Sequence, residues 1–414
     1  MPQHRAGVSH HDQERPLSTN DIGVAVIGAG MAGKAHAAAY RTAPTLFQSV
    51  LPPVRLVSIA DAYEPLAEAG ARRFGYERHD TSWQSIAEAD DIDVVSVVVA
   101  NHLHREIVEG LLAAGKHVLC EKPLSDTIES ARAMAEAART ASTVARVGFT
   151  YRRAPGVAFL RQLVQDGTLG EIFHVSGRYL TDYAADPNTA ISWRFKGDPG
   201  SGALADVGSH VAYLTEFIGG PVASVSGGRF ATVIPQRPKP LGAVSGHGVT
   251  AVSDELDTVE NDDYATFSVG YASGAAGSVE VSRVAAGFAN GLVLEVYGSK
   301  GSARWEQHTP SEVHLFLHEG PADQRGERRI LLGGAHPYVA GGAPIDVQGV
   351  GFGQNEGFAV QARAFLDEVA GLPEADSLPR NASFDDGVRN MVLLDSVAQS
   401  AAQDGASVSI PAAV

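Results

Sequence analysis

Residues 22–36 read IGVAVIGAGMAGKAH. The first six are apolar and largely β-branched, which is typical of a strand buried on both faces of a parallel sheet. The spacing GxGxxG follows at once, and the alanine-rich stretch after it favours a helix. A glycine turn between a strand and a helix is the fingerprint of a dinucleotide-binding unit, whereas the same spacing alone carries little weight.

Each glycine of the turn has its own physical reason. Gly28 permits the tight turn, Gly30 lets a pyrophosphate approach the backbone, and Gly33 lets the helix pack closely on the strand. The free N–H groups and the dipole at the helix start then attract phosphate. The predicted phosphate contacts are Gly28, Gly30, Met31, Ala32 and Gly33.

Asp61 ends the next predicted strand, residues 56–60. A carboxylate at this place can accept hydrogen bonds from the ribose hydroxyls and would repel the 2′-phosphate of NADP, so the predicted cofactor is NAD. Asp61 comes later than the usual spacing of about 20 residues, and a loop insertion over residues 44–53 explains the delay. Alternatively, Asp61 caps a helix that starts near Glu64.

The alternation of strands and helices continues to residue 149. Strands are expected at 93–100, 117–120 and 144–149, with helices at 105–114 and 126–141. This order predicts a doubly wound parallel sheet of the Rossmann type, whose ligands bind at the carboxyl ends of the strands. Further cofactor contacts predicted at that edge are Ala100, Asn101, His104, Glu121 and Lys122.

The second half changes pattern. Alternating segments separated by turn signals predict a large, mostly antiparallel sheet in an α+β domain. The expected strands are 171–180, 222–233, 262–269, 275–282, 291–297 and 312–318, with loops at 236–258 and 320–357 and helices near 357–371 and 384–403. We therefore expect a disordered tail over 1–20, a cofactor-binding domain over 21–149 and a second domain over 150–414.

Lys122 is the first candidate for chemistry, because it follows a strand at the ligand-binding edge. An ammonium group there can hydrogen-bond a substrate hydroxyl and stabilise a developing alkoxide. The alternative is an exposed lysine that pairs with Glu121.

Asp206 and His210 are the second candidate. A glycine-rich loop leads into a helix, and these two residues lie four apart, off its apolar stripe. A carboxylate beside an imidazole orients the ring and raises its pKa, so His210 could act as a base near neutral pH. The alternative is an ordinary surface pair.

Four motifs together resemble the Gfo/Idh/MocA oxidoreductase family: GAGMAGKAH at 28–36, NHLH at 101–104, AGKHVLCEKPL at 114–124 and GALADVGSH at 202–210. The resemblance covers nearly the whole chain from Asp21 on. It implies that Lys122, Asp206 and His210 are catalytic, and that an open-faced sheet in the second domain makes a homodimer or homotetramer.

Two further stretches resemble the levoglucosan dehydrogenase subgroup of that family, which also includes inositol dehydrogenase. They are YRRAP at 151–155 and ADPNTAISWRF at 185–195. Thr150 stands where close relatives have asparagine, and this leaves the exact sugar open. Besides the catalytic three, the predicted substrate contacts are Tyr151, Arg152, Asp182 and Trp193; Trp193 and Arg194 are also predicted to contact the cofactor.

Composition excludes several classes of protein. The net charge of −16 disfavours nucleic acid as a partner, and no apolar run approaches the length of about 20 residues that a membrane helix needs. The first residues lack the apolar core of a secretory signal. A single cysteine, Cys120, rules out a multi-cysteine zinc site and suits the cytoplasm, so no metal is expected.

The sequence thus predicts an NAD-dependent enzyme that oxidises a secondary hydroxyl of a cyclic polyol or sugar to a ketone. His210 would take the hydroxyl proton with Lys122 as electrostatic assistant. Competing hypotheses are a reductase of a keto-sugar or imine, a non-catalytic NAD-binding regulator, and a hydrolase that uses tightly held NAD as a redox relay.

Overall fold

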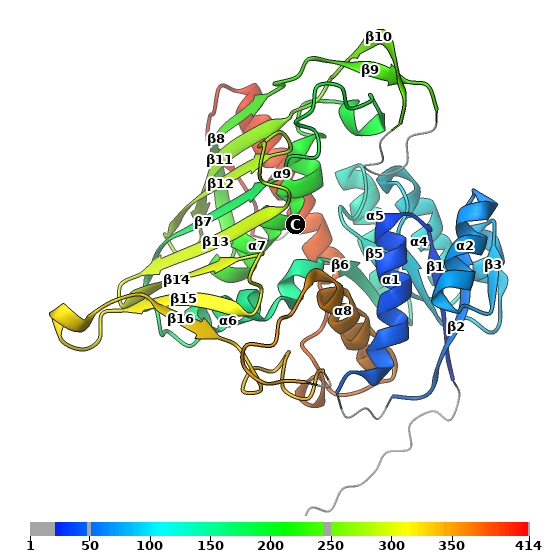
Figure 1. The fold of residues 1–414 in the computed structure, drawn as a ribbon, viewed down its shortest axis with the longest axis horizontal. Coiled ribbons are helices and arrows are strands. Elements are labelled where there is room, and N and C mark those ends of the chain that lie inside the picture. Colours follow the sequence, from blue (N-terminus) through cyan, green and yellow to red (C-terminus); the bar gives the residue numbers. More distant parts are fainter. Residues whose placement is uncertain (1–20, 48–50, 243–249, 344, 413–414) are drawn as a thin grey trace, which may run out of the picture.

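The computed structural model describes residues 21–47, 51–242, 250–343 and 345–412. The segment 1–20, for which we predicted a disordered tail, lies outside the described residues. The described residues build two large sheets that face each other across a layer of helices, and a small third sheet of two strands (Figure 1).

The first sheet is parallel and has six strands in the order β3-β2-β1-β4-β5-β6. This is the doubly wound order with a switch point between β1 and β4, as the strand and helix alternation predicted. The strands are β1 (Ile22–Ile27), β2 (Val54–Ala60), β3 (Arg78–Asp80), β4 (Val94–Val97), β5 (His117–Glu121) and β6 (Ala145–Gly148). The glycine turn that follows β1 therefore lies in the middle of the sheet, beside the switch point.

Helices connect these strands and cover the sheet. They are α1 (Met31–Thr42), α2 (Glu64–Phe74), α3 (Trp83–Glu88), α4 (His104–Ala113) and α5 (Ile128–Thr140). A late helix, α8 (Gln354–Val369), packs beside α1 and contributes Phe365 and Leu366 to the same apolar cluster as Val24 and Tyr40 (Figure 1). The second half of the chain therefore completes the core of the first sheet.

The second sheet has nine strands in the order β16-β15-β14-β13-β7-β12-β11-β8-β17. Among the described strands of this sheet, only β7 and β12 pair in parallel, and the other neighbours are antiparallel. The strands are β7 (Ile172–Leu180), β8 (Val222–Ala231), β11 (Tyr264–Tyr271), β12 (Ala276–Ser282), β13 (Gly291–Gly298), β14 (Gly301–Glu306), β15 (Glu312–Leu317), β16 (Arg328–Leu331) and β17 (Val408–Ser409).

One face of the second sheet is covered by helices and the other is open (Figure 1). The covering helices include α6 (Pro155–Gln165), α7 (Ser209–Gly219) and α9 (Phe384–Ala402). The large core cluster runs from Val97 of the first sheet through Val211 of α7 to Leu294 of the second. The two sheets thus share a continuous core.

One expected loop is a hairpin. Residues 236–258 contain β9 (Gln236–Pro240) and β10 (Val252–Thr258), which form a separate two-stranded sheet. Two prolines in β9 hid the strand from sequence reasoning, but a proline is tolerated where a strand has a free edge. The expected loop 320–357 likewise contains β16. No helix in the described part of the chain is long and apolar enough to cross a membrane.

Candidate active site

The glycine turn between β1 and α1 is shaped by three different constraints. Gly28 has φ +103°, and a Cβ atom there would lie 2.1 Å from the carbonyl oxygen of Val98. A Cβ atom on Gly33 would lie 1.8 Å from the carbonyl oxygen of Gly28, so helix and strand touch at this point. A Cβ atom on Gly30 would meet nothing within 4 Å among the described residues. The turn is therefore tightly packed at Gly28 and Gly33, and it is open at Gly30, where a pyrophosphate could approach the protein backbone.

The start of α1 fits an anion. Gly30 is its N-cap, and no described side chain caps the helix or places a carboxylate in its first turn. Its first N–H groups and the helix dipole therefore keep their positive character. Met31, which begins the helix, is 69% exposed. These features suit a dinucleotide pyrophosphate.

Asp61 lies at the end of β2 and joins it to the glycine turn. Its Oδ2 accepts a hydrogen bond of 2.8 Å from the Ala29 amide, and its Oδ1 accepts one of 2.9 Å from the Tyr63 amide. Tyr63 is the N-cap of α2, and no side-chain cap bond is formed there. The Asp61 carboxylate thus contacts both the glycine turn and the residue that precedes α2, and its contact with a ribose stays a prediction.

Lys122 connects the two halves of the molecule. It follows β5, and its Nζ donates a hydrogen bond of 3.0 Å to the backbone carbonyl oxygen of Asp206. The side chain therefore spans from the carboxyl edge of the first sheet to the segment that precedes His210. This bond brings the predicted lysine and the Asp206–His210 segment into one place.

The segment around Asp206 is a π-helix, Leu204–Gly208, that runs into α7. Sequence reasoning expected an ordinary helix, but the wider turn of a π-helix often marks a functional site. Asp206 Oδ2 accepts a hydrogen bond of 2.8 Å from the Tyr183 hydroxyl and lies 3.7 Å from Nη1 of Arg194. The carboxylate is thereby tied to the loop that follows β7.

His210 lies at the start of α7 and is half-buried. Burial lowers its pKa well below the usual value, and the nearby ammonium of Lys122 lowers it further. The sequence-based expectation was the opposite, a pKa raised by Asp206. Desolvation penalises the charged imidazolium directly, and the Asp206 carboxylate, which contacts Tyr183 and lies near Arg194, does not offset it. The ring is therefore neutral at neutral pH and able to accept a proton.

The ring of Tyr151 packs against the ring of His210. The two rings meet edge to face with their centroids 4.8 Å apart. The Tyr151 hydroxyl lies 2.8 Å from that of Tyr179 and accepts a hydrogen bond of 3.0 Å from Nε2 of Gln307. Tyr179 in turn donates to Oδ1 of Asn290 at 2.6 Å. These neutral groups form a hydrogen-bonded network on one side of the histidine.

Sequence reasoning missed Tyr179, Tyr183, Asn290 and Gln307. Tyr179 had a usable signal, because it shares the inward parity of Val175 in the alternating strand. The others stand in loops or at a strand end, where periodicity says nothing about direction. Their positions depend on the pairing of strands far apart in the chain.

The other predicted substrate contacts are only partly gathered. Trp193 is 63% exposed, and the guanidinium of Arg194 stacks on its ring at 4.6 Å. Asp182 accepts a hydrogen bond of 3.2 Å from the Gly287 amide. Arg152 points elsewhere: Nη1 donates to the Tyr213 hydroxyl at 2.7 Å, nearly one turn of α7 beyond His210.

Among the predicted cofactor contacts at the strand ends, two are turned inward. His104 is buried, with its ring nitrogens each 3.1 Å from the carbonyl oxygens of Val99 and Leu124. Burial lowers its pKa, and the neutral ring donates to one of these oxygens. The His104 ring thus links the segment that follows β4 to the segment that follows β5.

Glu121 is the second inward residue. Its Oε1 lies 2.9 Å from Nε2 of buried His36, and its Oε2 accepts a 3.1 Å hydrogen bond from the Lys122 amide. Ala100 and Asn101 lie half-buried just after β4, where a short 3-10 turn begins. In the described residues no cluster of three or more acidic, histidine or cysteine side chains could hold a metal ion.

The chain is similar in sequence to a known family of oxidoreductases. Residues 22–149 match the oxidoreductase family model with an NAD-binding Rossmann fold, and residues 157–304 match the GFO/IDH/MocA C-terminal domain. The chain is 38% identical over 387 residues to levoglucosan dehydrogenase of Pseudarthrobacter phenanthrenivorans, covering 93% of this chain and 97% of the relative.

Two further relatives agree. A solved structure of levoglucosan dehydrogenase in complex with NADH and levoglucosan superposes with a TM-score of 0.84 at 35% identity, over 95% of this chain and all of the other. The scyllo-inositol 2-dehydrogenase (NAD(+)) of Bacillus subtilis is 26% identical over 68% of this chain and 73% of its own length. With both of its halves matched, and with a relative aligned over almost its whole length, the chain belongs to the Gfo/Idh/MocA oxidoreductase family.

Proposed function

We propose that this protein is an NAD-dependent dehydrogenase that oxidises a secondary hydroxyl of a cyclic polyol or sugar to a ketone. The observation that carries the proposal is the hydrogen bond from Lys122 to the backbone of Asp206. It holds an ammonium group near a half-buried, neutral histidine at the carboxyl edge of the first sheet. The names of the relatives, levoglucosan and inositol dehydrogenases, support this substrate class.

The residues present fit NAD. The open side of Gly30, the uncapped start of α1 and the Asp61 carboxylate would hold the pyrophosphate and the ribose. Asp61 favours NAD over NADP, because a 2′-phosphate would be repelled there. When bound, NAD supplies the acceptor for the hydride that leaves the substrate carbon.

The chain itself would handle the proton. His210, neutral because burial and Lys122 lower its pKa, accepts the hydroxyl proton at a ring nitrogen as the hydride departs. The Lys122 ammonium stabilises the negative charge that develops on the same oxygen. Asp206, held by Tyr183, fixes the backbone carbonyl that positions Lys122. The reverse reaction, reduction of a keto-sugar, uses the same groups.

An absorbance assay at 340 nm tests the proposal. The full chain is mixed with NAD or NADP and a panel of inositols, anhydrosugars and hexoses, and NADH formation is followed. We expect turnover with NAD on at least one of them, and a fall of at least about 100-fold in kcat for His210→Ala and Lys122→Met. A non-catalytic regulator would show no absorbance change in either direction, and this result would remove the proposal.

We also propose how the molecule is organised. The open face of the nine-stranded sheet would join copies into a homodimer or homotetramer, and the units would divide between residues 149 and 150. The single cysteine of the sequence, Cys120, is buried and suits a reducing cytoplasm. The names of the relatives support a role in carbohydrate metabolism. Sedimentation velocity tests the assembly: a monomer at micromolar concentration would contradict it.

A further inference from the structure

The guanidinium of Arg194 faces Asp206 and carries an unsatisfied donor. Its Nη1 lies 3.7 Å from Oδ2 of Asp206. Its Nε is buried and has no hydrogen-bond partner within the described structure. Because buried donors are nearly always satisfied, this N–H group indicates that a ligand or a water molecule binds beside Asp206. The direction of the Arg194 side chain therefore bears on whatever binds there.

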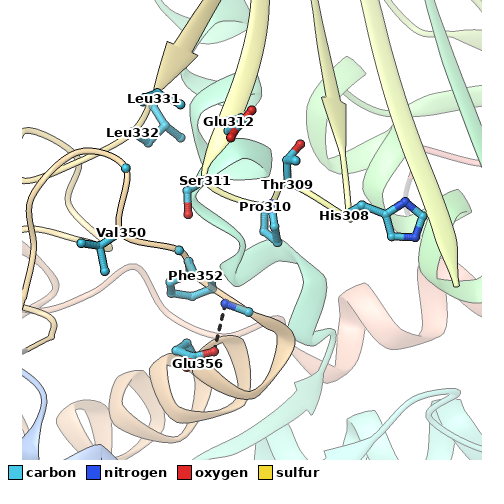
Figure 2. A pocket seen from close by; sticks show the side chains of 13 residues that line it. His308, Thr309, Pro310, Ser311, Glu312, Leu331, Leu332, Val350, Phe352 and Glu356 are labelled. Carbon is cyan, nitrogen blue, oxygen red and sulfur yellow. Dashed lines mark hydrogen bonds between the residues drawn. The ribbon is translucent and has the colours of Figure 1, made fainter.

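The two cavities beside Tyr151 do not position this arginine. One of them is lined by Ser311, Val350 and Phe352 among others (Figure 2), and the other is lined by Tyr151 itself. Neither has Arg194 among its described lining residues. The direction of Arg194 is therefore set by the protein groups that hold its backbone.

Two buried side chains hold the backbone of Arg194. Its carbonyl oxygen accepts a hydrogen bond of 3.1 Å from Nδ2 of Asn261 and one of 2.8 Å from Nη1 of Arg283. Both side chains belong to residues that are 1% exposed. Nδ2 of Asn261 also donates to the carbonyl oxygen of Lys196 at 3.0 Å. The 3-10 turn Trp193–Phe195 is thereby fixed by contacts within it and just after it.

Arg283 makes a hydrogen bond with each of its three nitrogens. Besides the bond from Nη1 to Arg194, Nη2 donates to Oδ1 of Asn261 at 2.9 Å, and Nε donates to Oδ1 of buried Asp263 at 2.8 Å. The guanidinium also lies over the ring of Phe195, 4.6 Å from its centroid. A planar guanidinium with three fixed acceptors has little freedom to move. The carbonyl of Arg194 is thus held by a rigid group.

Asp262, between Asn261 and Asp263, holds the segment that leads to Asp206. Its carboxylate accepts hydrogen bonds of 2.8, 2.9 and 2.9 Å from three backbone amides, those of Gly200, Gly202 and Leu204. The last of these amides begins the π-helix that carries Asp206. One short buried segment before β11 therefore fixes both the turn that carries Arg194 and the helix that carries its partner.

We propose that Asn261 and Arg283 are positioning residues for catalysis: they hold the Arg194 carbonyl so that its guanidinium faces Asp206 and the ligand bound there. The proposal rests on the function proposed above, because it assumes that a sugar is oxidised beside His210. Both residues are buried, so each acts through Arg194 and does not touch the substrate. A defect in either should therefore disappear when the Arg194 side chain is absent.

A double-mutant cycle on the full chain tests this. At saturating NAD, kcat/KM is measured for the wild type, Asn261→Ala, Arg194→Ala and the double variant, with a sugar that the absorbance assay shows to be turned over. We expect each single variant to lose at least about tenfold, and the double variant to lie within about threefold of Arg194→Ala. A smaller loss in either single variant, or a larger further loss in the double variant, would overturn the proposal and leave the proposed function standing. Turnover of no sugar by the wild type would defeat both.

Asn381→Ala is the matched control. Asn381 is 4% exposed, accepts a 3.1 Å hydrogen bond from Nε of Arg153 at its Oδ1, and donates one of 3.0 Å to the Gln361 carbonyl oxygen. It thus bonds to an arginine and to the backbone as Asn261 does, but at another place in the fold. Any loss of kcat/KM in Asn381→Ala should be the same with and without the Arg194 side chain. A loss that disappears in Arg194→Ala would show a general effect on the fold and would contradict the proposal.

Arg283→Lys provides a second test should Asn261→Ala fail to fold. The lysine keeps a positive charge for Asp263 but lacks the guanidinium that reaches Asn261 and the Arg194 carbonyl at the same time. We expect the same cycle with Arg194→Ala to give the same two limits. An equal loss from Arg283→Lys with and without the Arg194 side chain would overturn the proposal.

Discussion

His210 is the residue whose electrostatics matter most to this account. Its burial and the ammonium of Lys122 act in the same direction, and both keep the imidazole neutral. Sequence spacing could predict that Lys122, Asp206 and His210 belong together, because strand ends and helix faces follow from periodicity. It could not predict the sign of the pKa shift, since desolvation depends on everything packed around the ring.

The pH dependence of catalysis follows from this environment. The acid limb of kcat/KM should lie below pH 6.5, because His210 must lose its proton to act as a base and its pKa is lowered. In Lys122→Met the repulsion is gone, so the histidine pKa rises and the limb should move to higher pH. Rates measured from pH 4.5 to 8.5 on both proteins check this. A limb that stays in place, or moves lower, would show that the two groups do not interact.

At the scale of elements, the first sheet was the most predictable part of the molecule. Its strands other than β3 are mostly apolar, and their order follows from the alternation with helices. Strand β3 (Arg78–Asp80) is polar and half-buried, and it was not predicted. The β9–β10 hairpin and the π-helix at Leu204–Gly208 were not predictable, because tertiary contacts stabilise both. Arg237 of β9, for example, is fully buried and donates hydrogen bonds to the backbone oxygens of Ala184 and Asp186.

The turn between β1 and α1 offers a matched pair of substitutions. In Gly33→Ala the new methyl group would collide with the Gly28 carbonyl, so we expect a loss of stability of about 1–3 kcal/mol and weaker NAD binding. In Gly30→Ala the methyl group enters open space, so stability should hold while NAD binding weakens. Chemical denaturation and cofactor titration measure the two effects. Equal stabilities for the two variants would contradict this account of the turn.

At the scale of the whole molecule, the two sheets share their cores. Helix α8 comes from the second half of the chain yet packs on α1, and residue 147 of β6 pairs with residue 382. The family models match residues 22–149 and 157–304, so α8 and residue 382, which pack against the first sheet, lie outside both matches. A sequence pattern predicts the strands of each sheet. It cannot show that α8, from the second half of the chain, packs against the first sheet, because that contact leaves no periodic signal in the sequence.

The stability of the whole molecule should fall in acid. Burial lowers the pKa of His336 to about 4. Above pH 6.5 the His336 side chain is neutral in both the folded and the unfolded protein. Between pH 6.5 and about 4 it is protonated in the unfolded protein but stays neutral in the folded one, so protons favour unfolding. The resulting loss grows to about 3 kcal/mol near pH 4. In His336→Asn, whose amide can still accept from the Tyr338 N–H, the melting temperature should depend less steeply on pH between 7 and 4. Parallel curves for the two proteins would contradict this.

The central claim is that a lysine from the first sheet and a histidine from the second half act on one substrate atom. The most direct test is a crystal structure of the full chain with NADH and a sugar that the assay shows to be turned over. The account predicts Nζ of Lys122 and a ring nitrogen of His210 within about 2.6–3.2 Å of the same substrate oxygen. An oxygen held by neither group, with the sugar bound and the cofactor in place, would contradict it.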